Sequence, residues 1–436
     1  MFVPALGPEA SDLVSLIQST SAHAARCRKV IVCHQGHEND VCCTENIFEF
    51  LSAHGLDCGF LHLCGPHTEA ELRDCLAHGR DVALLGFNSQ LDHAWVDDEP
   101  LLLAAARHGV TVVQWILDHP SSRWPEFNYS NPATSRFLFH SRSSQAYFAR
   151  YCCPGSTTAT AGSVGPSWRS RSATESFEGF SQRPVACLIA LGLTRLGKTV
   201  AETEADIEAL GGPLARSLRD AVARARFNLD RPLEIHLSAA LYDGGLVLDG
   251  GAFNRCFRLL NDSVQYLRRA EIVQVASRFG VHIQSDETAR GLTEGGRASF
   301  RQDVSTRETL DTMPRCRAVL SASPINDSIH DRTCNALNAG CLPVVEDNRA
   351  HRELFVDGKN ALLFRYGDGS LAECLALACG GPDRTFALAE AARTMRDRWP
   401  FRFGSFQNIV ALAGLAGPTP PMQRAEGVHR DDGPGR

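Results

Sequence analysis

Long hydrophobic runs are missing from this sequence. No apolar stretch approaches the length that spans a membrane, and the first residues lack the charged and apolar regions of a secretory signal. Strong positive charge is missing as well, because the net charge is -6 and no basic stripe stands out. Polyanion binding is therefore disfavoured. We expect a cytoplasmic protein with no integral membrane segment and no nucleic-acid partner.

Cysteine pairs of the C-x-x-C type are absent, although the chain has 16 cysteines. The cysteines are scattered and no secretory signal points to an oxidising compartment, so a disulfide framework is not indicated. Structural zinc sites need closely spaced ligands, which are not found here. We expect most of these cysteines to be buried as small hydrophobic residues.

What the sequence does contain is a regular alternation of strand-like and helix-like segments. Its 436 residues are 44% hydrophobic and 22% charged, as in an ordinary globular protein. Short apolar segments predict strands at 28–35, 57–64, 81–87 and 110–117, with helical periodicity between them. A second series of the same kind begins at residue 185. Such alternation predicts βαβ units and parallel sheets.

Composition divides the chain into four parts. We expect a Rossmann-like N-terminal domain in 1–165, a Ser-, Gly- and Pro-rich linker in 166–184, a second domain in 185–414 and a disordered tail in 415–436. Two doubly wound domains place a ligand at the carboxyl ends of their strands, in the cleft between them. The expected fold class is therefore α/β, with two Rossmann-like domains that face a cleft.

Residues Gly192 to Thr199 read GLTRLGKT and fit the phosphate-binding pattern G-x-x-x-x-G-K-[ST]. A strand-like segment precedes them and a helix-like segment follows, as a phosphate loop requires. One interpretation is a P-loop nucleoside triphosphatase that uses Lys198, with Asp249 after an apolar segment as a candidate Mg²⁺ ligand. The pattern has few fixed positions, so other segments must decide the class of protein.

The segment 318–378 contains the most informative motifs. Its successive parts read SASPINDSIHDR, TCNALNAGC, LPVVED, RELFVDGKN, ALLFRY and GDGSLAECLALA. In this order and spacing they resemble the donor-binding half of group 1 glycosyltransferases of the GT-B fold, in the branch related to spore maturation proteins. The resemblance implies an enzyme that moves a sugar from a nucleoside-diphosphate sugar to an acceptor hydroxyl, with no metal and no other cofactor. It does not identify the acceptor as a glycan, a lipid or a protein.

Candidate donor-binding residues lie in the same segment. Arg332 can bind a phosphate bidentately beside a helix N-terminus, and His330 can contact the same diphosphate. Asn326, in the preceding loop, is assigned to the donor as well. Glu353 follows a strand and can accept hydroxyl groups of the ribose or the sugar. The alternative is that Arg332 forms a surface salt bridge and Glu353 caps a helix.

Retaining relatives have two carboxylates separated by seven residues. The corresponding positions here are Asp327 and Asn335. Because an amide cannot act as a carboxylate, a retaining mechanism that needs this pair is not predicted, although Asn335 can still hydrogen-bond the ribose or sugar. A non-catalytic protein that binds a nucleotide sugar is therefore an alternative. The resemblance also implies that Arg195 and Lys198 of the Gly-rich loop neutralise the donor diphosphate.

The acceptor side needs a group that removes the proton of the attacking hydroxyl if configuration inverts. Asp118 and His119 directly follow the strand-like segment 110–117, and they can act as a base and the group that orients it. A strand-ending turn explains the same two residues. His140, at the end of another strand-like segment, and the loop 36–39 have weaker claims to the acceptor site.

Overall fold

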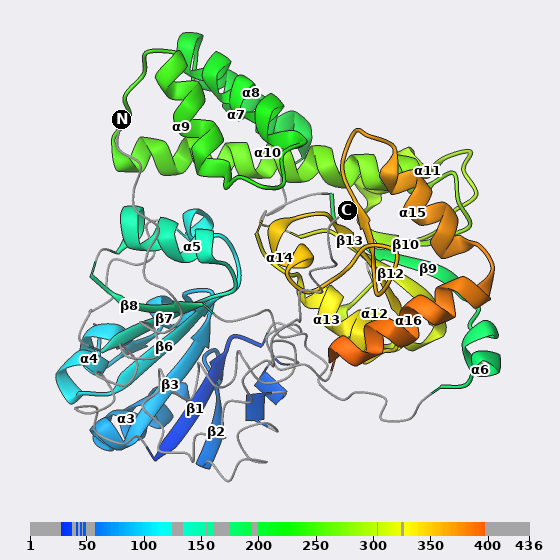
Figure 1. Cartoon of the computed structure of the whole chain (residues 1–436). Coiled ribbons are helices and arrows are strands. Elements are labelled where there is room, and N and C mark those ends of the chain that lie inside the picture. Colours follow the sequence, from blue (N-terminus) through cyan, green and yellow to red (C-terminus); the bar gives the residue numbers. More distant parts are fainter. Residues whose placement is uncertain are drawn as a thin grey trace, which may run out of the picture.

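Two parallel β-sheets of six strands each form the framework of the protein in the computed structural model. One sheet belongs to the N-terminal half and the other to the C-terminal half, and helices pack around both (Figure 1). This confirms the predicted α/β fold with two doubly wound halves. The structure describes residues 28–36, 41, 44, 45, 47, 48, 57–123, 134–153, 155–160, 175–193, 199–302, 304–323 and 327–396.

The sheet of the N-terminal half has the strand order β2-β1-β3-β6-β7-β8, with all neighbours parallel. Its central strands are buried apolar runs, as expected for a parallel sheet between layers of other elements. α3 and α4 share one hydrophobic cluster with β1, β3 and β6. The elements are β1 (Lys29–His34), β2 (Asp57–His62), α3 (Thr68–Ala77), β3 (Val82–Phe87), β4 (Trp95–Val96), β5 (Glu99–Pro100), α4 (Leu101–His108), β6 (Thr111–Ile116), β7 (Ser135–Phe139), α5 (Arg142–Tyr147), a π-helical turn (Phe148–Cys152) and β8 (Thr157–Thr160).

The sheet of the C-terminal half has the order β11-β10-β9-β12-β13-β14. In chain order this is the 3-2-1-4-5-6 arrangement of dinucleotide-binding folds, so the direction of winding reverses between β9 and β12. Ligands of such sheets bind at the carboxyl ends of the strands beside this reversal. The elements are α6 (Phe177–Ser181), β9 (Val185–Ala190), β10 (His282–Ser285), α11 (Arg290–Thr293), β11 (Ser299–Gln302), α12 (Thr306–Thr312), β12 (Cys316–Ser321), α13 (Asp331–Asn338), β13 (Leu342–Glu346), α14 (Arg349–Arg352), β14 (Leu362–Phe364), α15 (Ser370–Cys379) and α16 (Pro382–Arg396).

Four helices are inserted between β9 and β10 and form a layer of their own (Figure 1). They are α7 (Val200–Ala209), α8 (Gly212–Arg226), α9 (Leu233–Asp243) and α10 (Gly250–Ala276). α10 has 27 residues, which makes it about 40 Å long. Tyr147 of the N-terminal half packs in the hydrophobic core of these helices, and its hydroxyl donates to Asn254 Oδ1 at 2.5 Å. The insertion therefore contacts both halves of the molecule.

The sequence patterns predicted neither β8, which lies inside the expected domain 1–165, nor α6, which lies inside the expected linker 166–184. β8 pairs with β7, and α6 packs Phe177 and Phe180 against Phe386 of α16. These differences arise from packing, because an edge strand and a short helix gain most of their stability from neighbouring elements.

The described cysteines form no disulfide, and most of them are buried. This agrees with their expected role as small hydrophobic residues. In the described ranges, no helix is both long enough and apolar enough to cross a membrane.

Candidate active site

The N-terminus of α13 lies just beyond the carboxyl end of β12. His330 is the N-cap residue, and its Nδ1 accepts a hydrogen bond from the Arg332 backbone N–H at 3.1 Å. Arg332 Nη1 lies 3.4 Å from His330 Nε2, and Asp331 contacts the other side of the imidazole. The structure therefore brings together the two residues that the motif assigns to the donor diphosphate. Their contact with a donor stays a prediction.

Charges at this helix terminus are strongly coupled. Burial alone would raise the pKa of Asp331, but His330 and Arg332 outweigh it and hold that pKa well below its usual range. Burial also lowers the pKa of His330, and the nearby charges of Arg332 and Arg269 lower it further while Asp331 opposes them. Burial therefore favours the neutral form of the imidazole, and Arg332 supplies positive charge to this group.

Two further predicted donor residues lie in different surroundings. Asn335 is on α13 and is only 3% exposed, which leaves little of its side chain accessible to a donor. Glu353 is exposed at the C-terminal end of α14, where its Oε1 pairs with Arg349 at 3.3 Å. This surface ion pair is an alternative to the donor-binding role predicted for Glu353. Asn326, Arg195 and Lys198 lie outside the described residues, as does the loop 37–39.

Glu346, which the motif analysis did not select, is the carboxylate buried at the end of β13. It accepts a hydrogen bond from the Ser323 N–H at 2.9 Å and another from the Tyr366 hydroxyl. Burial raises its pKa, while the positive charge of Arg268 opposes the shift. Glu346 therefore joins the ends of β12, β13 and β14. The signal for it was its position as the last residue of an apolar strand.

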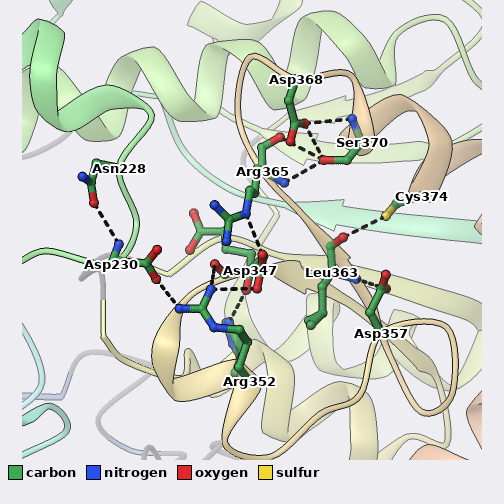
Figure 2. Close-up of polar contacts among 12 residues, drawn as sticks. Asn228, Asp230, Asp347, Arg352, Asp357, Leu363, Arg365, Asp368, Ser370 and Cys374 are labelled. Carbon is green, nitrogen blue, oxygen red and sulfur yellow. Dashed lines mark hydrogen bonds and ion pairs between the residues drawn. The ribbon is translucent and has the colours of Figure 1, made fainter. Parts of the chain in front are cut away.

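A second charged network lies beside this one and is shown in Figure 2. Asp347, next after β13, accepts from Arg352 at 2.9 Å and from Arg365 at 2.6 Å. Arg352 also pairs with Asp230, in the connection between α8 and α9. These ion pairs attach the helical insertion to the carboxyl edge of the C-terminal sheet.

The Gly-rich loop after β9 is described at its two ends. The Gly192 carbonyl accepts from Arg269 Nη1 at 2.8 Å, and the Leu193 N–H donates to Asp286 Oδ2 at 2.6 Å. At the far end, Thr199 and Glu202 form a capping box that closes the N-terminus of α7. The Thr199 N–H donates to the Glu202 carboxylate at 2.7 Å. A carboxylate therefore occupies the position where a P-loop would hold phosphate.

Asp249 does not follow a strand. It is the N-cap residue of α10, and its Oδ1 accepts from the Ala252 N–H at 2.7 Å. Its expected position as the Mg²⁺ ligand of a triphosphatase is therefore wrong, because that role requires a carboxylate at a strand end. Among the described residues, no group of three or more His, Cys, Asp and Glu side chains can hold a metal ion.

In the N-terminal half, Asp118 follows β6 and is held by Asn88, which follows β3. Asn88 Nδ2 donates to Asp118 Oδ2 at 3.3 Å, and Asn88 Oδ1 accepts from the Asp118 N–H at 3.1 Å. Asn88 has a positive φ of 44°, a conformation that Asn tolerates better than most residues. Asp118 is therefore a fixed carboxylate at the carboxyl edge of the sheet.

His119 lies in the packed interface with the insertion. Its ring is stacked on Phe257 of α10 at 4.3 Å and contacts Tyr147 edge-on at 4.6 Å. Its Nδ1 is 2.9 Å from Ser121 Oγ, and the residue is 4% exposed. The catalytic role of His119 stays a prediction, and its surroundings are those of a packing residue.

His140, at the end of β7, is surrounded by groups from both halves. Burial lowers its pKa, whereas the Ile116 carbonyl and the carboxylates of Asp118 and Asp327 oppose the shift. His330 of the C-terminal half also affects this pKa. The Nε2 atom of His140 is buried and has no hydrogen-bond partner among the described residues. The structure thus supports a role of His140 in the site more strongly than its sequence context did.

Asp327, the first position of the expected carboxylate pair, contacts the N-terminal half directly. It accepts from the Ser143 backbone N–H at 3.1 Å and from Ser143 Oγ at 2.5 Å. Glu234 of α9 is close enough for the charge of Asp327 to affect it. Burial, with this added repulsion, raises the pKa of Glu234 to about 7. No motif in the sequence marks Glu234, which lies in α9 of the insertion.

Comparisons with known proteins agree with this arrangement. Residues 264–399 match the model of a family described as glycosyl transferase-like. The T4 phage protein BGT, solved with its substrate UDP-glucose, is 8% identical, with a TM-score of 0.51 over 88% of this chain and 99% of that chain. A glycosyltransferase from Rickettsia africae is 9% identical (TM-score 0.49; 89% and 98% covered), and HepE from Anabaena, solved with UDP and glucose, is 11% identical (TM-score 0.46; 88% and 98% covered). No curated protein matches the sequence significantly.

The fold is that of the GT-B class, as the T4 phage structure indicates at this level of identity. The family match covers the motifs after β12, β13 and β14 that gave rise to the resemblance. The predicted fold class is confirmed, and residues 264–399 are similar to the glycosyl transferase-like family. Its relation to the spore maturation branch stays a prediction.

Proposed function

We propose that the protein transfers a sugar from a nucleoside-diphosphate sugar to an acceptor hydroxyl in the cytoplasm, without a metal ion. One observation supports this most directly. The Ser143 N–H of the N-terminal half donates to Asp327 of the C-terminal half at 3.1 Å. His140 lies three residues before Ser143, and the charges of Asp118, Asp327 and His330 all affect its pKa. The proposed proton acceptor and the helix end proposed to bind the diphosphate therefore lie close together, as transfer between two bound substrates requires.

In this proposal the acceptor hydroxyl gives its proton to His140, and its oxygen bonds to the anomeric carbon of the donor. The bond from that carbon to the diphosphate breaks, and the nucleoside diphosphate leaves. Asn88 holds Asp118 in place beside His140. Arg332 and the N-terminal N–H groups of α13 stabilise the negative charge of the leaving group. These charges do the work that a metal ion does in other transferases.

Donor binding is tested by thermal unfolding with UDP, GDP, dTDP and UDP-glucose, and with ATP in the presence and absence of Mg²⁺. A ligand that binds only the folded protein raises the unfolding temperature. We expect one nucleoside diphosphate to raise the unfolding temperature, and we expect EDTA not to abolish this increase. Arg332→Ala should weaken this binding roughly 10- to 100-fold, because a hydrogen bond to a charged group is lost.

Arg255→Ala is the matched control, since Arg255 is an exposed arginine of α10. Unchanged donor affinity in Arg332→Ala would remove Arg332 from the donor site. An assay for release of nucleoside diphosphate from the sugar donor then distinguishes an enzyme from a protein that only binds the donor.

A P-loop triphosphatase is the weaker candidate. The capping box of Thr199 and Glu202 puts negative charge at the N-terminus of α7, and Asp249 caps a helix. Both features oppose Mg-triphosphate binding. Stabilisation by Mg-ATP alone would favour this candidate over sugar transfer.

A further inference from the structure

Two adjacent arginines on α10 lie in different environments. Arg268 is 1% exposed, and it donates to the carbonyls of Ala225 at 2.7 Å, Arg226 at 2.9 Å and Asn228 at 3.2 Å. These carbonyls belong to the C-terminal end of α8, where cationic donors are favourable. Arg268 therefore has a structural role in attaching α10 to α8.

Arg269 points to the carboxyl edge of the C-terminal sheet instead. Its Nη1 donates to the Gly192 carbonyl at 2.8 Å, and Gly192 lies two residues after the end of β9. Its side chain is only partly buried. β9 is the strand beside the reversal of winding, so the guanidinium lies where doubly wound sheets bind their ligands.

The charge of Arg269 affects the pKa values of three other groups, which further define where Arg269 lies. They are His330 after β12, Glu346 at the end of β13 and Tyr366 after β14. Arg269 therefore lies near the ends of four neighbouring strands. His330 is also the N-cap of α13, so the guanidinium is close to the helix terminus assigned to the donor diphosphate.

We propose that Arg269, supplied by the helical insertion, binds the diphosphate of the sugar donor together with Arg332 of α13. This inference rests on the proposed function. A guanidinium matches the geometry of phosphate oxygens, and a helix N-terminus supplies further donors to the same anion. The insertion is thus part of the donor site, and α10 has one arginine that holds the fold and one that binds substrate.

The test compares Arg269→Met and Arg269→Lys with the wild type and with the control Arg255→Met. The probe is whichever of UDP, GDP and dTDP stabilises the wild type, together with its nucleoside, and both affinities are measured by titration calorimetry. We expect Arg269→Met to reduce the affinity for the nucleoside diphosphate roughly 10- to 100-fold, whereas the affinity for the nucleoside should not change. Arg269→Lys should recover part of the loss, and Arg255→Met should change neither affinity.

Retained nucleoside affinity shows that Arg269→Met is folded. If the Met variant does not fold, the nucleoside diphosphate affinity of Arg269→Lys decides instead. Equal loss of nucleoside and nucleoside diphosphate would assign Arg269 a structural role and overturn the proposal. Unchanged diphosphate affinity in both variants would overturn it too, while the proposed function stands. If no nucleoside diphosphate binds the wild type, the proposed function fails and this inference fails with it.

Discussion

The carboxyl edges of the two sheets differ in chemistry. In the N-terminal half, Asn88, Asp118 and His140 form a small group with one carboxylate and one imidazole. In the C-terminal half, Arg332 and Arg269 accompany the N-terminus of α13 and the buried carboxylate of Glu346. The first edge is suited to moving a proton and the second to holding an anion. The predictions below alter one of these edges, a buried group beside it, or the insertion that contacts both halves.

The largest effect is expected from His140→Ala in the N-terminal half. Loss of a general base reduces kcat roughly 10²- to 10⁴-fold, whereas donor affinity should change little. Burial holds the pKa of His140 below its ordinary value, so the wild-type base is active at pH 7 and kcat falls as the pH decreases through that pKa. Steady-state kinetics across pH check this. Loss of donor affinity with an unchanged kcat would contradict this assignment and indicate that His140 binds the donor.

His351, buried in the C-terminal half, should make stability depend on pH. Burial lowers its pKa to about 4, from about 6.5 in the unfolded chain. The unfolded chain therefore binds the proton first on acidification. Stability from this group is complete above about pH 6.5 and falls as the pH drops towards 4, by about 3 kcal/mol in total.

Urea unfolding between pH 4 and 8 measures this dependence. His351→Asn keeps a donor for the Glu346 carbonyl, which His351 Nδ1 contacts at 2.8 Å, and should flatten the profile in this range. An equally steep profile in the variant would assign the dependence to other groups.

Phe257→Leu tests the contact between the insertion and the N-terminal half. Phe257 is fully buried against His119 and Tyr147, at 4.3 and 4.9 Å between ring centres. Loss of these aromatic pairs should cost about 1–2 kcal/mol of unfolding free energy. Denaturant unfolding checks the value, with the exposed Phe227 changed to Leu as the control. Equal changes in the two variants would mean that Phe257 adds no more than a surface residue.

The smallest effect is expected from Arg352→Ala. Its ion pairs with Asp230 and Asp347 lie at the surface, with the arginine side chain 37% exposed. Exposed pairs contribute less than about 1 kcal/mol, and salt screens them. The difference from the wild type in thermal unfolding should therefore shrink in high salt. A salt-independent loss of several degrees would mean that the network of Figure 2 holds the insertion in place.

Local patterns were enough to predict much of this architecture. Apolar runs and helical periodicity predicted β1, β2, β3 and β6 with errors of one or two residues. Capping residues and strand ends likewise placed Asp118, His330 and Arg332 at the carboxyl edges of their sheets. These features depend on neighbours along the chain, which the sequence lists directly.

Other features depended on contacts between distant segments. Nothing local distinguishes Arg268 from Arg269 on one helix, or shows that His119 packs against Phe257 while His140 meets Asp327. The sequence alone determined the class of fold, the order of its elements and the motif of the donor-binding half. Only the tertiary structure decided which side chains converge between the halves, because side-chain direction and burial are set by how strands and inserted helices pack together.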